Sequence, residues 1–171
     1  MKALVANDYG QPPSNLEVTD VPDPTPGPGQ LLVGIEAAAL NPIDLKLITG
    51  ALRETMPVTF PHLIGMDGSG AVTGTGDGVT GFSEGDAVVG FFGATPGTIA
   101  EYAVIDVGPL VSARPDGLDA VHAAAVPESG MTALTLLRQQ SCSPEIACSW
   151  SARPAASACS SSSLRPPRAP T

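Results

Sequence analysis

The sequence has few aromatic residues, few basic residues and no long hydrophobic run. Phe, Trp and Tyr make up 4% of its 171 residues, and 8 Lys and Arg stand against 17 Asp and Glu. This balance argues against a nucleic-acid-binding protein, because phosphate contacts need clustered Lys or Arg. The longest apolar run, residues 31–40, is interrupted by Glu36 and is far shorter than the roughly 18 residues of a membrane span. Residues 1–5 do not begin a long apolar segment of the signal-peptide type, so we expect no membrane association and a cytoplasmic location.

Glycine is absent from the last part of the chain, and cysteine is absent from the rest. All 19 glycines lie in residues 1–137, whereas all 3 cysteines lie in residues 138–171. Residues 1–137 hold 4 basic and 16 acidic side chains (net −12), but residues 138–171 hold 4 Arg and 1 Glu (net +3). The odd number and irregular spacing of the cysteines match no zinc or disulfide framework. The composition of 138–171 is typical of a Ser/Pro/Ala-rich disordered tail.

Short apolar segments between Gly- and Pro-rich turns predict a mainly β fold for residues 1–137. The expected strands are residues 2–6, 16–21, 31–38, 70–75, 86–91 and 99–105. Asn41-Pro42 predicts the start of a short helix, with Asn41 as N-cap, that stops at Gly50. Helices are also expected over 118–125 and 128–137. This pattern predicts an α+β, mainly β protein: a small closed or partly closed β-barrel with C-terminal helices.

Three sequence features could suggest a functional site, but none has the full pattern that such a site requires. Residues 76–81 have the spacing G-x-G-x-x-G, but a turn and a strand follow them where a dinucleotide loop requires a helix, so we interpret them as a wide hairpin with glycines at positive φ. His62 and His122 have no Cys near them in sequence, so we expect no zinc site and no other metal. Ser69 has glycine on both sides but lacks the G-x-S-x-G spacing of a serine hydrolase.

Six stretches in residues 1–137 carry motifs in a characteristic order. They are Pro-Gly-Pro-Gly-Gln at 26–30, Ala-Ala-Ala-Leu-Asn-Pro-Ile-Asp-Leu-Lys at 37–46, Gly-Met-Asp-Gly-Ser-Gly-Ala-Val at 65–72, Gly-Val-Thr-Gly-Phe-Ser-Glu-Gly-Asp-Ala-Val at 78–88, Ala-Glu-Tyr-Ala-Val at 100–104 and Ala-Ala-Ala-Val-Pro-Glu-Ser-Gly-Met-Thr-Ala at 123–133. Their order resembles the N-terminal GroES-like domain of the medium-chain dehydrogenase/reductase superfamily, in its zinc-independent quinone oxidoreductase (zeta-crystallin-like) branch. The resemblance implies a GroES-like catalytic domain over 1–126 and, over 127–137, the start of the helix that links it to a cofactor domain.

The resemblance also implies a site and a reaction. Zinc-dependent members carry Cys where Asn41 stands and Gly-His-Glu near residues 65–67, so this sequence is similar to the members that work without zinc. In that branch NADPH delivers a hydride to a small-molecule quinone or enone. Asn41 and Asp44 are then the candidate catalytic residues, and Asn41 and Thr132 the candidate cofactor-binding residues. Considered without the family, Asn41 is a plain helix cap, Asp44 a first-turn acid and Thr132 an ordinary helix residue.

Residues 138–171 cannot form the glycine-rich loop of the Rossmann domain that follows in the family, so that domain is missing. If the reading frame is shifted and third bases are taken as G or C, Gly becomes possible at Ser151, Pro154, Ala155 and Ser157, at the spacing G-x-x-G-G-x-G. We hypothesise a frameshift near Leu137, in the gene or in its recorded sequence. DNA sequencing tests this hypothesis, and incompatible third bases would contradict it.

On the frameshift hypothesis the chain is an inactive N-terminal fragment that binds NADPH weakly or not at all. Family members often pair through the cofactor domain, so we do not expect this chain to dimerise. Two alternatives remain open from the sequence: a non-catalytic GroES-like barrel that acts through protein contacts, and a trans-acting enoyl reductase.

Overall fold

The computed structural model describes residues 1–93 and 97–139. The chain divides into a first compact unit, Met1–Thr132, and a second unit that begins at Ala133. In the second unit, only the remainder of one helix is described, and its Leu134, Leu136 and Leu137 side chains are exposed. From residue 140 onward, the sequence to which the frameshift hypothesis applies lies outside the described residues.

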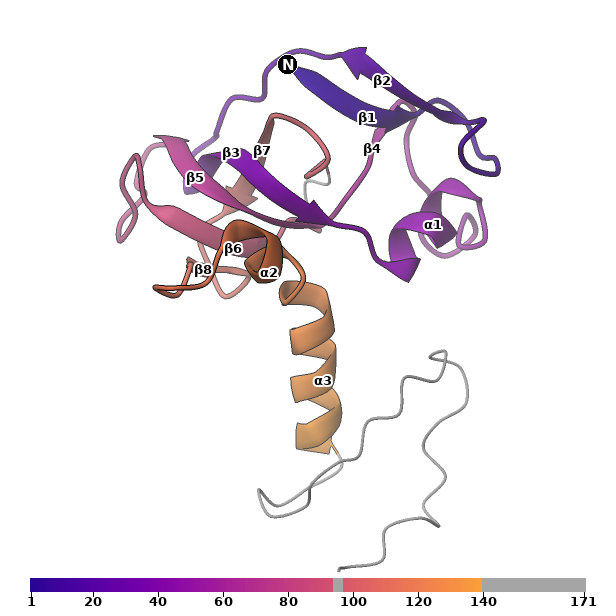
Figure 1. The fold of residues 1–171 in the computed structure, drawn as a ribbon. Coiled ribbons are helices and arrows are strands. Elements are labelled where there is room, and N and C mark those ends of the chain that lie inside the picture. The colour runs from indigo at the N-terminus through magenta and orange to yellow at the C-terminus, as the bar shows by residue number, and fades with distance from the viewer. Residues whose placement is uncertain (94–96, 140–171) are drawn as a thin grey trace, which may run out of the picture. The chain divides into compact units, whose positions relative to one another are not determined.

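Among the described residues of the first unit, eight strands form two antiparallel sheets (Figure 1). The three-stranded sheet has the order β2-β1-β4, made of β1 (Lys2–Ala6), β2 (Leu16–Asp20) and β4 (His62–Leu63). The five-stranded sheet has the order β7-β3-β5-β6-β8, made of β3 (Gln30–Ala39), β5 (Asp67–Thr75), β6 (Ala87–Phe91), β7 (Tyr102–Asp106) and β8 (Val111–Ala113). The helices are α1 (Pro42–Ile48), α2 (Ala120–Ala124) and α3 (Pro127–Gln139). The predicted mainly β class with C-terminal helices is confirmed, and the hydrogen bonding leaves two open sheets.

Two predicted strand starts were wrong by three residues. β5 begins at Asp67 and not at residue 70, because Asp67 and the two residues after it pair with Ala37–Ala39 of β3. β7 begins at Tyr102 and not at residue 99. The Ile99 carbonyl accepts a hydrogen bond from Leu4 N–H, and Ala100 forms a bridge with Ala3, so this stretch joins the small sheet to the large one.

The glycine-rich segment 76–81 is the hairpin turn that the sequence predicted. It connects β5 to β6, which pair antiparallel, and no helix follows it. Gly78, Gly81 and Gly85 have φ angles of 77°, 84° and 91°. These left-handed conformations favour glycine, which explains the residue type without a bound phosphate.

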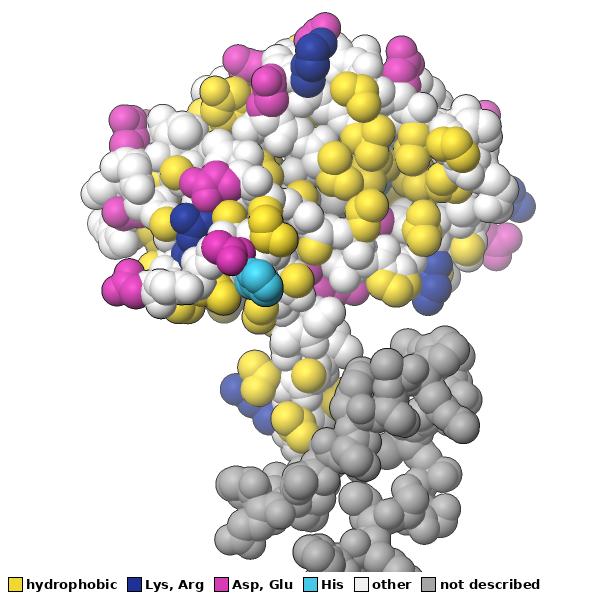
Figure 2. All heavy atoms as spheres, in the orientation of Figure 1, with side chains coloured by type: hydrophobic (Ala, Val, Ile, Leu, Met, Phe, Trp, Pro, Cys, Tyr) yellow, Lys and Arg dark blue, Asp and Glu magenta, His cyan; other side chains and the backbone are white. Residues whose placement is uncertain are grey.

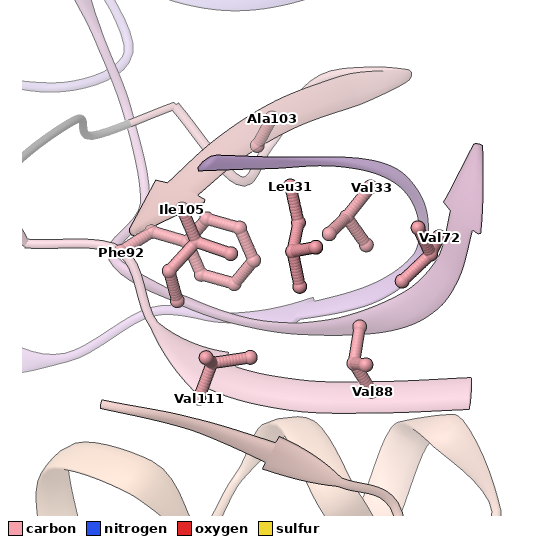
Figure 3. Packing of buried hydrophobic residues seen from close by; sticks show 8 residues of the cluster. All are labelled: Leu31, Val33, Val72, Val88, Phe92, Ala103, Ile105 and Val111. Atoms are coloured by element: carbon pink, nitrogen blue, oxygen red, sulfur yellow. The ribbon is translucent and has the colours of Figure 1, made fainter. Parts of the chain in front are cut away.

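The large sheet encloses the main hydrophobic core (Figure 3). Leu31 and Val33 of β3 point toward Val72 and Val88 from the next two strands, and all four are at most 2% exposed. Each such side chain contributes about 1.5–3 kcal/mol when buried. β3 and β5 are therefore firmly held, and β3 leads directly into the segment that carries Asn41 and Asp44.

A second cluster fixes α1 against the small sheet. Ala6, Ile48 and Ile64 are buried together, with Leu4 and Phe60 packed against them. Because Ile48 ends α1, this cluster holds the helix whose first turn carries Asp44.

The surface is acidic with some exposed apolar side chains. Figure 2 shows acidic side chains spread over the face in view and hydrophobic ones gathered on part of it. Within residues 1–93 and 97–139, no helix is long and apolar enough to cross a membrane.

Candidate functional site

Asn41 stands where β3 gives way to α1. Its backbone is extended (φ −118°, ψ 162°), which makes it the N-cap, and Pro42 takes the first helical position. The Asn41 N–H donates to Asp44 Oδ2 at 2.7 Å, and the Asp44 N–H donates to the Asn41 carbonyl oxygen at 3.1 Å. The helix start predicted from Asn41-Pro42 is thus confirmed, and it brings the two candidate catalytic residues together.

The Asn41 side chain contacts a different segment. Its Nδ2 donates to Asp67 Oδ2 at 3.0 Å, while the same side chain also takes part with Asp44 in a capping box at the start of α1. Asp67 is the first residue of β5 and is completely buried. The carboxamide is therefore held in one orientation, with its nitrogen toward Asp67.

The Asp67 carboxylate also binds the first turn of α3. The Glu128 N–H lies 3.2 Å from Asp67 Oδ1 and 3.1 Å from Oδ2. The first N–H groups of a helix have no partner within the helix, and a carboxylate is favoured there. The Glu128 side chain provides another hydrogen-bond acceptor at this place. Its Oε2 is buried and has no hydrogen-bond partner among the described residues.

Three carboxyl groups come together here: Asp44, Asp67 and Glu128. No ion pair found in the described part of the chain includes Asp44, Asp67 or Glu128. Burial raises the pKa of Asp44, although backbone hydrogen bonds from Asn41 and Gly65 oppose it. Burial likewise raises the pKa of Asp67, and it raises the pKa of Glu128 together with the charges of Asp67 and Asp44. These carboxyls therefore hold a proton at higher pH than exposed carboxyls do.

His62 of β4 lies near this group. Burial lowers the pKa of its imidazole, and the charge of Asp44 opposes that effect. Among the described residues, no group of three or more His, Cys, Asp or Glu has the arrangement to hold a metal ion. Met66, which precedes Asp67, is a buried apolar side chain with 6% exposure.

Thr132, the candidate cofactor-binding residue, lies on α3 with an exposed side chain. It follows Glu128 by four residues, so the two lie on one face of the helix, one turn apart. No hydrogen bond in the described part of the chain joins Thr132 to Asn41 or Asp44. The structure brings Asn41 and Asp44 together and leaves Thr132 one turn from the hydrogen bond at Glu128 N–H.

The other residues weighed from the sequence have structural roles. Ser69 is buried and donates from Oγ to the Val88 carbonyl at 2.8 Å, and Arg114 Nη1 donates to Ser69 Oγ at 3.3 Å. His122 is exposed, and its backbone N–H donates to Asp119, the N-cap of α2.

Sequence reasoning did not identify Asp67 or Glu128 as site residues. One signal for Asp67 was present: an acidic residue within the glycine-rich stretch 65–70, next to a buried strand. Glu128 had no such signal, because the hydrogen bond that involves it joins residues 61 positions apart. Two surface hollows, of about 140 and 490 Å³, lie elsewhere and include none of these residues.

Comparisons with known proteins agree with the motif order. Residues 27–115 match the alcohol dehydrogenase GroES-like domain family. The chain is 41% identical over 140 residues to a chloroplastic quinone-oxidoreductase homolog of Spinacia oleracea, covering 81% of this chain and 42% of that protein. It is also similar to the quinone oxidoreductase of Coxiella burnetii (33% identity, TM-score 0.72, covering 81% of this chain and 44% of that one).

A third relative was solved with a cofactor. It is a mycobacterial protein in complex with NADPH (33% identity, TM-score 0.73, covering 81% of this chain and 41% of that one). The chain thus spans about two-fifths of the length of the relatives it matches. With its match over residues 27–115 and its two antiparallel sheets, the chain belongs to the alcohol dehydrogenase GroES-like domain family, with quinone oxidoreductases among its relatives.

Proposed function

We propose that this domain is the substrate-side part of a zinc-independent, NADPH-dependent reductase of quinones or enones. The observation that carries the proposal is the Asn41 carboxamide, fixed at the start of α1 by a hydrogen bond to the buried Asp67. An amide at this position offers a ligand hydrogen bonds and no Lewis acid. The similarity to quinone oxidoreductases, and to a relative solved with NADPH, supports the same assignment.

The residues at the site fit a nicotinamide cofactor. Asn41 Nδ2 uses one N–H for Asp67, and the carboxamide oxygen has two lone pairs, so the oxygen can accept a hydrogen bond from a ribose hydroxyl or amide donor of a ligand in addition to its part in the capping box. The buried Oε2 of Glu128 is another acceptor beside Asp67. NADPH held there would supply a hydride, which with one proton would reduce a quinone to the hydroquinone and leave NADP⁺.

The chain's own residues position the reactants. Asn41 orients the ligand, and Thr132 offers a hydroxyl from the exposed side of α3. Asp44 is 4% exposed and bonds the Asn41 backbone, so we assign it to positioning Asn41 and not to contact with the substrate. Such positioning accounts for much of the rate when the cofactor carries the chemistry.

The proposal is tested by NMR titration of the ¹⁵N-labelled chain with NADPH up to millimolar concentration. We expect weak binding that shifts the Asn41 side-chain amide and the Thr132 amide. Asn41→Ala should abolish the shift at Thr132, whereas Asn7→Ala, at an exposed asparagine just after β1, should leave it unchanged. Shifts confined to other residues, or none, would contradict the proposal.

The cytoplasmic location of the protein and the identity of the quinone or enone substrate stay predictions. The spinach relative is named as a chloroplast protein, so its location gives no support for the cytoplasm. Imaging of the tagged full chain in its host tests the location.

A further inference from the structure

Asp67 has an arrangement that packing alone does not require. It is fully buried, and the charged groups that face it are the acidic Asp44 of α1 and Glu128 of α3. Burying a carboxylate without a cation is costly unless hydrogen bonds satisfy it. The hydrogen bonds it accepts come from Asn41 Nδ2 and Glu128 N–H.

These two donors belong to the two segments that carry the candidate cofactor residues. Asn41 is itself a candidate, and Glu128 lies one turn before Thr132 on α3. The segments are 26 and 61 positions from Asp67 in sequence, so a single carboxylate ties together parts of the chain that have no local reason to meet.

The geometry has a specific consequence for Asn41. A carboxamide can rotate so that either its nitrogen or its oxygen faces a neighbour. A carboxylate only accepts, so Asp67 selects the orientation in which Nδ2 faces it. An amide in place of the carboxylate would have one acceptor oxygen instead of two and no charge, so Glu128 N–H would lose one of its two contacts and both donors would lose the attraction of the carboxylate.

We propose that Asp67 is a positioning residue of this site, which sets the orientation of the Asn41 carboxamide and holds the first turn of α3 so that both face the same ligand. The inference rests on the proposed function and goes beyond it, because it assigns a role to a residue that does not itself contact the ligand.

The test compares three variants of the ¹⁵N-labelled chain by NMR. Asp67→Asn removes the carboxylate. Asp67→Glu keeps it on a longer side chain. Asp86→Asn is the matched control, because Asp86 is exposed and its Oδ2 accepts a backbone N–H from Ser83 at 2.7 Å, in a turn of the β5–β6 hairpin.

With Asp67→Asn we expect the Asn41 side-chain NH₂ and the Glu128 amide resonances to move, while core amides such as that of Val88 keep their positions. The apparent Kd for NADPH should rise about tenfold, and Asp67→Glu should recover part of that loss. Asp86→Asn should leave the Kd and both resonances unchanged.

Two outcomes overturn the proposal: unchanged Asn41 and Glu128 resonances in Asp67→Asn, or an equal change in Asp86→Asn. If the resonances move as expected but the unmodified chain shows no NADPH-dependent shift, the positioning by Asp67 stands and the proposed function fails. The resonances and the titration thus test the two proposals separately.

Discussion

Gly70 of β5 is a position in the large sheet where the addition of one methyl group should do severe damage. A Cβ built there would meet the backbone of β3: it would lie 2.9 Å from Gly34 C and 3.0 Å from Ile35 Cα, and closer still to the Gly34 carbonyl oxygen. The obstacle is backbone, not a side chain that can rotate, so β3 and β5 must separate. Overpacking of a core costs about 1–3 kcal/mol, and we place Gly70→Ala at the upper end, about 3 kcal/mol. For a unit the size of Met1–Thr132, this corresponds to a fall in Tm of about 10 °C.

Gly74, on the same strand, is the matched control. Its added Cβ would lie 3.7 Å from Leu32 Cβ, which is ordinary van der Waals contact. Gly74→Ala should therefore raise stability by about 0.4–1 kcal/mol, because alanine restricts the unfolded chain. Thermal unfolding followed by circular dichroism measures both. Similar melting temperatures for the two variants would refute the reasoning, since they differ only in what the methyl group meets.

Two other perturbations have defined outcomes. Leu31→Ala should cost about 2–5 kcal/mol in urea unfolding, because Leu31 is completely buried, while Val18→Ala, at a residue 66% exposed, should change stability by less than about 0.5 kcal/mol; equal losses would contradict the assigned core. The pKa of Asp44 is raised above its ordinary value of 3.8, so the folded state binds this proton more tightly than the unfolded state does. The Asp44 contribution to stability is thus full below about pH 3.8 and is lost as the pH rises through the folded-state pKa. Asp44→Asn lacks this loss, so its stability relative to the unmodified chain should improve as the pH rises from about 4. Urea unfolding at several pH values measures this difference in stability. A difference that shrinks or reverses as the pH rises would contradict the raised pKa.

The elements predicted correctly from the sequence are those whose cause is local. Asn41-Pro42 and Gly50 mark the two ends of α1 because capping and helix termination act within a few residues. The 76–81 hairpin was predictable in the same way, because its glycines take positive φ angles.

The site required contacts that no local pattern carries. Residues 67–69 include few strongly strand-forming side chains and form a strand only because β3 and β6 pair with them on both sides. The family resemblance indicated Asn41 and Asp44, but the hydrogen bonds of Asp67 to Asn41 and Glu128 depend on the folded arrangement of three separate segments.

Because Asp67 begins β5, the orientation of Asn41 and the packing of the large sheet are physically coupled. Gly70 lies three residues along that strand, so the separation of β3 and β5 in Gly70→Ala should displace the Asp67 carboxylate as well as destabilise the core. Leu31→Ala, by contrast, leaves a cavity in the core without forcing the two backbones apart. The two variants should therefore lower stability by similar amounts but differ at Asn41: its side-chain amide resonance moves with Gly70→Ala and stays in place with Leu31→Ala. Equal movement would mean that Asn41 responds to general loosening of the core, and that the backbone of β5 does not set its orientation.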